Sequence, residues 1–160
     1  MALVPRGWIA LSTSKQCKET TSSGSSAFRE QISSYGLDAK EFTSPFEGED
    51  VSCFEFGESP KLSVYLYSMI AGPYEAIVSD RDEIKNYKFP LKLYSRQSIK
   101  KYVEKAKEEY FHVTKCGINF YEDLFGTDYP FEKLDQVFVP DYNMGAMENV
   151  GCVIYRDDYV

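Results

Sequence analysis

Two apolar segments, Leu134-Asp-Gln-Val-Phe-Val139 and Val150-Gly-Cys-Val-Ile-Tyr155, flank the pentapeptide Gly145-Ala-Met-Glu-Asn149. Both segments are rich in β-branched and aromatic residues, and Pro140 follows the first one. Short runs of this kind, bounded by turn residues, are typical of strands. The stretch therefore predicts two strands, with a short turn between them that carries one carboxylate, Glu148.

Upstream of these strands, residues 98–116 show the apolar spacing of a helix. Oppositely charged residues also lie one turn apart on its other side, which favours a solvated face. We expect Ser95 or Ser98 to cap this helix, and Lys115 followed by Gly117 to end it. A second short helix is predicted over residues 118–125, ending at Gly126. The apolar positions are Ile99, Tyr102, Val103, Ala106, Tyr110 and Val113, and the charged pairs are Lys100 with Glu104 and Lys105 with Glu109.

The first ninety residues have the character of β-sheet with loops. Residues 12–26 consist largely of Ser and Thr without apolar periodicity, so we expect a surface loop there. Together the two halves predict an α+β fold, with a mostly β piece over residues 1–92 and an α/β piece over residues 93–160. Strands are expected within residues 4–11, 51–56, 62–70 and 91–94, the third ending at Gly72-Pro73.

The bulk composition indicates a folded protein that does not bind polyanions. The chain has 160 residues, 43% of them hydrophobic, and a formal net charge of −7. Nucleic acids and anionic membranes both require clustered Lys and Arg, so neither is expected as a partner. The longest apolar run, residues 64–72, is too short to span a bilayer.

The cysteines, at positions 17, 53, 116 and 152, form no C-x-x-C pair. We interpret all four as reduced thiols, and two disulfides are the alternative in a secreted protein. Residues 2–11 lack the uninterrupted core of a signal peptide, which also favours the cytoplasm over secretion. The single histidine, His112, is interpreted as a structural residue of the helix and is not assigned to a metal site.

The pentapeptide suits a group that meets the free amino terminus of a peptide. Glycine at position 145 allows an otherwise costly φ and a close backbone approach, and Ala146 keeps that approach open. A peptide can then pair with the exposed strand edge. Glu148 can accept a charge-assisted hydrogen bond from an α-ammonium group. The alternative is a plain hairpin loop with one solvated glutamate.

The order of motifs along the chain resembles that of the gluzincin zinc aminopeptidases, the aminopeptidase N family. The resemblance is collinear over essentially the entire chain, and the pentapeptide matches the exopeptidase motif of that family residue for residue. The other matching segments are Pro5-Arg-Gly-Trp8, Phe56-Gly-Glu-Ser-Pro-Lys-Leu-Ser-Val-Tyr-Leu66, Gly72-Pro-Tyr74, Arg96-Gln-Ser98, Phe125-Gly-Thr-Asp-Tyr-Pro-Phe-Glu-Lys-Leu-Asp135 and Val139-Pro-Asp141.

This resemblance implies an architecture and a role for the pentapeptide. Residues 1–92 would be the end of an amino-terminal, saddle-like β-domain, and residues 93–160 the start of a thermolysin-like catalytic domain. Glu148 would bind the substrate α-amine, while Gly145 and Ala146 would present backbone to the substrate. Met144 would line the first specificity pocket, with plain turn packing as the alternative. Met147 completes the substrate-binding segment, and Asn149 is expected to hold the turn by local hydrogen bonds.

The resemblance also implies a zinc cofactor whose ligands lie outside these 160 residues. In the family, zinc is held by an H-E-x-x-H helix and a later Glu, and no H-E-x-x-H occurs here. We therefore expect no catalytic and no metal-binding residue within the chain, and peptides with a free amino terminus as substrates of the full enzyme. The alternatives are a truncated, non-catalytic paralogue that binds peptide amino termini and an unstable relic without activity.

Overall fold

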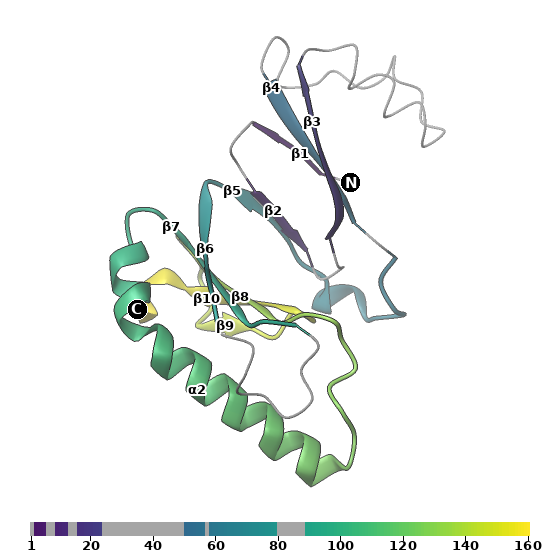
Figure 1. The fold of residues 1–160 in the computed structure, drawn as a ribbon, viewed down its shortest axis with the longest axis vertical. Coiled ribbons are helices and arrows are strands. Elements are labelled where there is room, and N and C mark those ends of the chain that lie inside the picture. The colour runs from purple at the N-terminus through teal and green to yellow at the C-terminus, as the bar shows by residue number, and fades with distance from the viewer. Residues whose placement is uncertain (1, 6–8, 13–15, 24–49, 57, 80–88) are drawn as a thin grey trace.

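The computed structural model describes residues 2–5, 9–12, 16–23, 50–56, 58–79 and 89–160. Within these ranges the chain forms three β-sheets and one long helix (Figure 1). The elements are β1 (Ala2–Pro5), β2 (Ile9–Ser12), β3 (Gln16–Ser23), β4 (Asp50–Phe56), the 3-10 turn η1 (Val64–Leu66), β5 (Met69–Gly72), β6 (Tyr74–Val78), β7 (Lys92–Arg96), α2 (Lys100–Phe125), β8 (Asp135–Val139), β9 (Ala146–Met147), β10 (Cys152–Arg156) and the 3-10 turn η3 (Asp157–Tyr159).

The largest sheet has five strands in the order β6-β7-β8-β10-β9. Strands β7, β8 and β10 run parallel to one another, while β6 and β9 are antiparallel to their neighbours. Helix α2 connects β7 to β8, as a parallel pair requires a crossover. Figure 1 shows α2 lying across one face of this sheet, with β2 and β5 beyond the opposite face.

Alternation along the central strands divides the core into two clusters. Leu93 and Phe138 face α2, where they pack with Leu91, Val103 and Phe111. Tyr94 and Val137, each one residue along, lie in the other cluster with Leu11, Ile70 and Cys152. Because side chains alternate across a strand, a sheet covered on both faces buries consecutive residues. This explains why residues 135–138 are all buried.

Several predicted elements are confirmed, and the mixed sheet with one helix is compatible with the predicted α+β fold. The strands expected within residues 51–56, 91–94, 134–139 and 150–155 correspond to β4, β7, β8 and β10. The residue 4–11 region contains the end of β1 and most of β2. The domain boundary near residue 92 stays a prediction, and β6 pairs with β7 across that position.

The helix prediction was wrong about the first stop and the cap. Residues 100–125 form one helix that continues through Gly117 and ends at Gly126, which has φ 62° and donates its N–H to Glu122 O at 2.8 Å. A glycine inside a helix costs about 1 kcal/mol. Packing of Phe111 and Ile118 on the core offsets this cost. The N-cap is Ile99, with no side-chain capping bond.

The buried stripe of α2 also differs from the predicted one. Val103 and Phe111 are buried, but Tyr102 and Val113 are 47% and 62% exposed. The predicted Lys100–Glu104 ion pair is present at 3.8 Å, and Lys100 Nζ also donates to Glu75 Oε2 at 2.5 Å. Ile99, Val103 and Tyr110 of the predicted stripe do pack on the core, but Tyr102 and Val113 lie outside it. Phe111, which the periodicity did not single out, is buried.

Two strand predictions in the first half need correction. Residues 16–23, expected in a loop, form β3, which pairs antiparallel with β4 from Gln16 opposite Phe56 to Ser23 opposite Asp50. Backbone pairing thus overrides a polar composition, and threonine is favourable in strands. Residues 62–68 are not a strand: η1 occupies residues 64–66, and only β5, paired with β2, is extended.

Candidate functional site

The pentapeptide lies at the edge of the five-stranded sheet. Ala146 and Met147 form β9, which pairs with Tyr155 and Ile154 of β10. Arg156 N–H donates to Gly145 O at 3.1 Å and extends the pairing by one residue. No strand of the described residues pairs with the outer side of β9. The segment predicted as a simple turn is therefore a short edge strand, whose outer backbone edge pairs with none of the residues that the structure describes.

Glu148 follows this edge strand and is exposed. Within the described residues, its carboxylate makes no hydrogen bond or ion pair. Ala146 is exposed as well, and Met144, before the strand, is 62% exposed. The structure therefore presents one unpaired carboxylate, a small residue and a flexible thioether on the same short segment. Met147, next in the chain to Ala146, is half-buried.

Gly145 is needed for close approach and not for an unusual φ. Its φ lies outside the left-handed region, contrary to the sequence-based expectation, and the positive φ angles nearby belong to Asp141 (54°) and Gly151 (65°). A Cβ built on Gly145 would lie 2.6 Å from the Tyr159 hydroxyl. A side chain at position 145 would thus displace Tyr159, a residue that the sequence interpretation did not single out.

Asn149 is buried and bonds to a distant segment. Its Nδ2 donates to the carbonyls of Tyr65 and Tyr67 at 3.5 and 3.4 Å. The next residue, Val150, donates its N–H to Leu66 O at 3.1 Å. The local hydrogen bond expected of Asn149 is made by its backbone, since Cys152 N–H donates to Asn149 O at 3.1 Å. Its side chain instead reaches η1 and the residue after it, more than 80 residues away in the sequence. Asn149 Oδ1 is buried without a partner in the described part of the chain.

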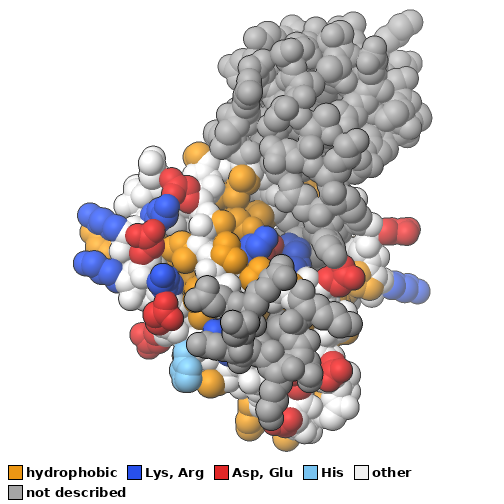
Figure 2. Space-filling model, in the orientation of Figure 1, with side chains coloured by type: hydrophobic (Ala, Val, Ile, Leu, Met, Phe, Trp, Pro, Cys, Tyr) orange, Lys and Arg blue, Asp and Glu red, His pale blue; other side chains and the backbone are white. Residues whose placement is uncertain are grey.

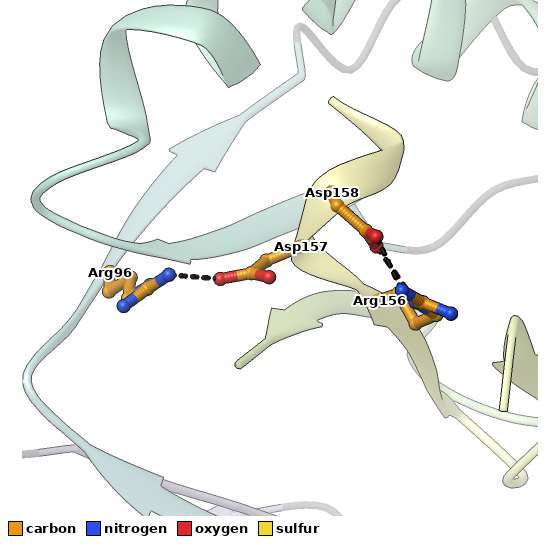
Figure 3. A network of polar contacts seen from close by, with 4 residues as sticks. All are labelled: Arg96, Arg156, Asp157 and Asp158. Atoms are coloured by element: carbon orange, nitrogen blue, oxygen red, sulfur yellow. Dashed lines mark hydrogen bonds and ion pairs between the residues drawn. The ribbon is translucent and has the colours of Figure 1, made fainter. Parts of the chain in front are cut away.

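A network of ion pairs fixes η3 beside the pentapeptide (Figure 3). Arg96 of β7 contacts Asp157 at 2.5 Å, and Arg156 of β10 contacts Asp158 at 2.5 Å. The hydrogen bond from Arg156 lowers the pKa of the Asp158 carboxyl. Tyr110 of α2 donates its hydroxyl to Tyr159 O at 3.0 Å. These contacts join three elements around Tyr159 and so position the ring that meets Gly145. The Arg-Asp-Asp string at the end of β10 is the only sequence signal for this network.

The structure contains no candidate for a catalytic zinc centre among the residues it describes. No group of three or more His, Cys, Asp or Glu side chains there has the geometry to hold a metal ion. Cys152 is fully buried, and burial raises the pKa of its thiol. Cys116 is exposed, and both of these cysteines are free thiols. The described residues therefore do not fit the zinc centre that the family resemblance implies, and no hydrolytic step is assigned to them.

One polar pair outside the pentapeptide was missed by the sequence interpretation. His112 and Cys116 are four residues apart on α2, and Cys116 Sγ lies 3.6 Å from His112 Nε2. Residues at this spacing lie on the same helix face. The spacing itself was the available signal. No helix in the described part of the chain is long and apolar enough to cross a membrane.

Comparison with known proteins finds one family, by its sequence model and by individual relatives. The sequence model of the Peptidase family M1 domain matches residues 109–160. Aminopeptidase N of Streptomyces lividans is 38% identical over 107 residues, which cover 67% of this chain and 12% of the relative. Aminopeptidase 2 of Candida albicans is 36% identical over 63% of this chain and 10% of the relative, and aminopeptidase N of Mus musculus is 35% identical over 68% and 11%.

The chain thus spans about a tenth of the length of the curated relatives that it matches. The aligned share of this chain, about two thirds, includes more than the region that the family model covers. These matches agree with the collinear motifs that end in the pentapeptide at the sheet edge. On these grounds the chain belongs to the aminopeptidase N family of M1 peptidases.

Proposed function

We propose that this chain supplies the part of a zinc aminopeptidase that holds the amino terminus of a peptide substrate. The observation that carries the proposal is the exposed, unpaired carboxylate of Glu148 directly after the edge strand β9. In a peptide bound along this edge, the α-ammonium pairs with Glu148. The peptide backbone pairs with β9, as in other recognition by strand addition.

The proposed contact with Glu148 favours peptides with a free amino terminus. A charge-assisted hydrogen bond contributes about 1.5–3 kcal/mol. An acetylated or internal peptide bond has no positive charge to place beside Glu148, so it lacks this contribution. Tyr159 and Met144 flank the same segment, and Met144 is the side chain that we assign to the wall of the first specificity pocket. A thioether there adapts to several substrate side chains.

Zinc enters the proposal only through the family. Proteins of the M1 peptidase family generally depend on zinc, which activates a water molecule for attack on the amide. The described residues of this chain orient the substrate and leave that chemistry to residues elsewhere. We accordingly expect the 160-residue chain to bind peptides and to hydrolyse no aminoacyl reporter, with or without added zinc. Turnover by a pure sample that a chelator abolishes would contradict this expectation.

A binding experiment on the chain tests the role of Glu148. The amide resonances of residues 144–149 are followed by NMR during titration with an alanyl tripeptide and, separately, with its N-acetylated form. We expect the free-amine peptide to bind about 10- to 150-fold more tightly. In Glu148→Gln this difference disappears, because the amide is uncharged. Glu109→Gln, at another exposed glutamate, is the control that should retain it.

Two outcomes would contradict the proposal. Equal affinity of the parent chain for the two peptides would remove the α-amine from the recognised features. If Glu148→Gln still bound the free-amine peptide more tightly than the acetylated one, a group other than Glu148 would bind the α-ammonium. The alternative function, a binding module without catalysis, rests on the same contacts. Aminopeptidase activity of a longer protein that contains this chain would favour the first function over this alternative.

A further inference from the structure

His112 and Cys116 form a side-chain pair on the solvent side of α2, far along the chain from the pentapeptide. Both residues are exposed, and the histidine is visible in pale blue at the surface in Figure 2. Cys116 Sγ and His112 Nε2 are 3.6 Å apart. Neither residue belongs to the buried core clusters. The core therefore does not account for this pairing of a thiol with an imidazole.

The separation of the two atoms matches that of two ligands on one metal ion. In tetrahedral zinc sites the metal lies about 2.3 Å from a thiolate sulfur and about 2.0–2.1 Å from an imidazole nitrogen. Two such bonds at the tetrahedral angle place sulfur and nitrogen about 3.5 Å apart. The observed 3.6 Å matches this separation, so a metal ion between the two atoms requires the side chains to reorient but not to move apart. Two ligands at positions i and i+4 of a helix are also the spacing used by the H-E-x-x-H motif.

We propose that His112 and Cys116 chelate one thiophilic divalent cation, of the class of Zn²⁺ or Cd²⁺, on the surface of α2. The sulfur–metal bond replaces the S–H bond and its proton passes to solvent, while the neutral imidazole gives its Nε2 lone pair. No third His, Cys, Asp or Glu of the described residues joins the pair, so water fills the remaining positions. Sulfur and imidazole ligands select such metals over Mg²⁺ and Ca²⁺.

Cadmium binding to the purified 160-residue chain tests the proposal. The absorbance of the sulfur-to-cadmium charge-transfer band is recorded during titration, with Mg²⁺ as the metal that should give no signal. The decisive variant is the double exchange Cys116→Gly with Gly117→Cys. It preserves the composition and moves the thiol about 100° around the helix, away from His112. A Cβ built at position 117 meets no neighbouring atom within 4 Å outside the backbone of the helix itself, so there is room for the exchanged residue to begin.

We expect the parent chain to bind one Cd²⁺ at this pair, with an affinity about tenfold or more above that of the exchanged variant, since the second ligand is already in place. His112→Ala should lose cadmium affinity to the same extent, although its thiol stays at position 116. Circular dichroism checks that both variants retain α2. Equal cadmium affinity of the parent chain and the exchanged variant, or full binding by His112→Ala, would overturn the proposal and leave only adventitious binding by a thiol.

Discussion

Strands β8 and β9 belong to the same sheet but differ in burial and in backbone pairing. In β8, residues 135–138 are buried, and Phe138 packs against Tyr110 of α2 and Tyr155 of β10 at ring distances of 5.2 and 5.7 Å. In β9, two residues pair with β10 and, among the described residues, with no strand on the other side, and Ala146 is exposed. The centre of this sheet is thus covered on both faces, while at its edge the part of the chain that the structure describes leaves the outer side of β9 unpaired and Glu148 exposed.

The largest effect is expected from Phe138→Ala at the centre. Truncation of a fully buried phenylalanine loses its apolar burial and leaves a cavity, at a cost of about 3–5 kcal/mol in the free energy of unfolding. Urea denaturation followed by circular dichroism measures this cost. Phe120→Ala, at a side chain that is 60% exposed, is the control and should change stability by only about 0.5 kcal/mol. Equal losses in the two variants would contradict the contrast between centre and surface.

The second prediction concerns the pH dependence of stability that arises from Tyr94, on the face of the sheet opposite α2. Burial raises the pKa of the Tyr94 phenol above its usual value of 10.0, and nearby Asp135 and Cys152 raise it further. The unfolded chain therefore releases this proton at a lower pH than the folded chain. Stability should fall as the pH rises above about 10, by about 1.4 kcal/mol per pH unit for this group.

Tyr94→Phe isolates this contribution, because it retains the ring and removes the ionisable group. Its free energy of unfolding, measured by urea denaturation from about pH 9 to about pH 11.5, on either side of the usual phenol pKa, should decline less steeply than that of the parent chain. Tyr121→Phe changes a ring that is 56% exposed and serves as the control. Parallel pH profiles for the parent chain and Tyr94→Phe would contradict the prediction.

Asn149 is the buried residue of a pentapeptide whose other residues are exposed or half-buried. Its substitution should therefore have an intermediate effect on the free energy of unfolding. Asn149→Ala removes two long hydrogen bonds to carbonyls and should cost about 1 kcal/mol. Asn149→Asp places a buried carboxylate against those same carbonyls, and should cost about 2–3 kcal/mol at about pH 7.

The two Asn149 variants should also differ in pH dependence. The charged form of the introduced aspartate is disfavoured in the folded state, so the folded pKa of its carboxyl is raised, and protonation restores stability as the pH falls. Thermal unfolding at about pH 7 and about pH 4.5 therefore should show a narrowing gap between the two variants. A gap that stays constant would mean that the carboxylate is solvated, and that η1 moves away from it.

The smallest effect on stability is expected from Glu148→Gln at the edge. The carboxylate has no partner in the described structure, so the free energy of unfolding should change by about 0.5 kcal/mol or less. Urea denaturation of the same samples used for peptide titration provides the measurement. A much larger loss would indicate a structural role for Glu148, and would weaken the comparison between centre and edge.

The sequence predicted the strands on either side of the pentapeptide because their β-branched runs are local signals. It also expected a helix to end at Gly126, where positive φ favours glycine, although it assigned that end to a second, separate helix. It failed where the decisive partner is distant. Residues 16–23 become a strand through pairing with β4, and the helix continues through Gly117 because neighbouring residues pack on the sheet. Composition and helical breakers cannot anticipate such contacts.

The candidate site divides in the same way. The sequence by itself determined the family, the pentapeptide and the single carboxylate Glu148, since these are carried by residue identity and order. Only the tertiary structure decided that Ala146 and Met147 form an edge strand and that Asn149 bonds to η1. It also showed that Gly145 makes room for Tyr159. The physical reason is that these features depend on backbone and side-chain contacts between segments that the chain order keeps apart, and local propensity contains no information about them.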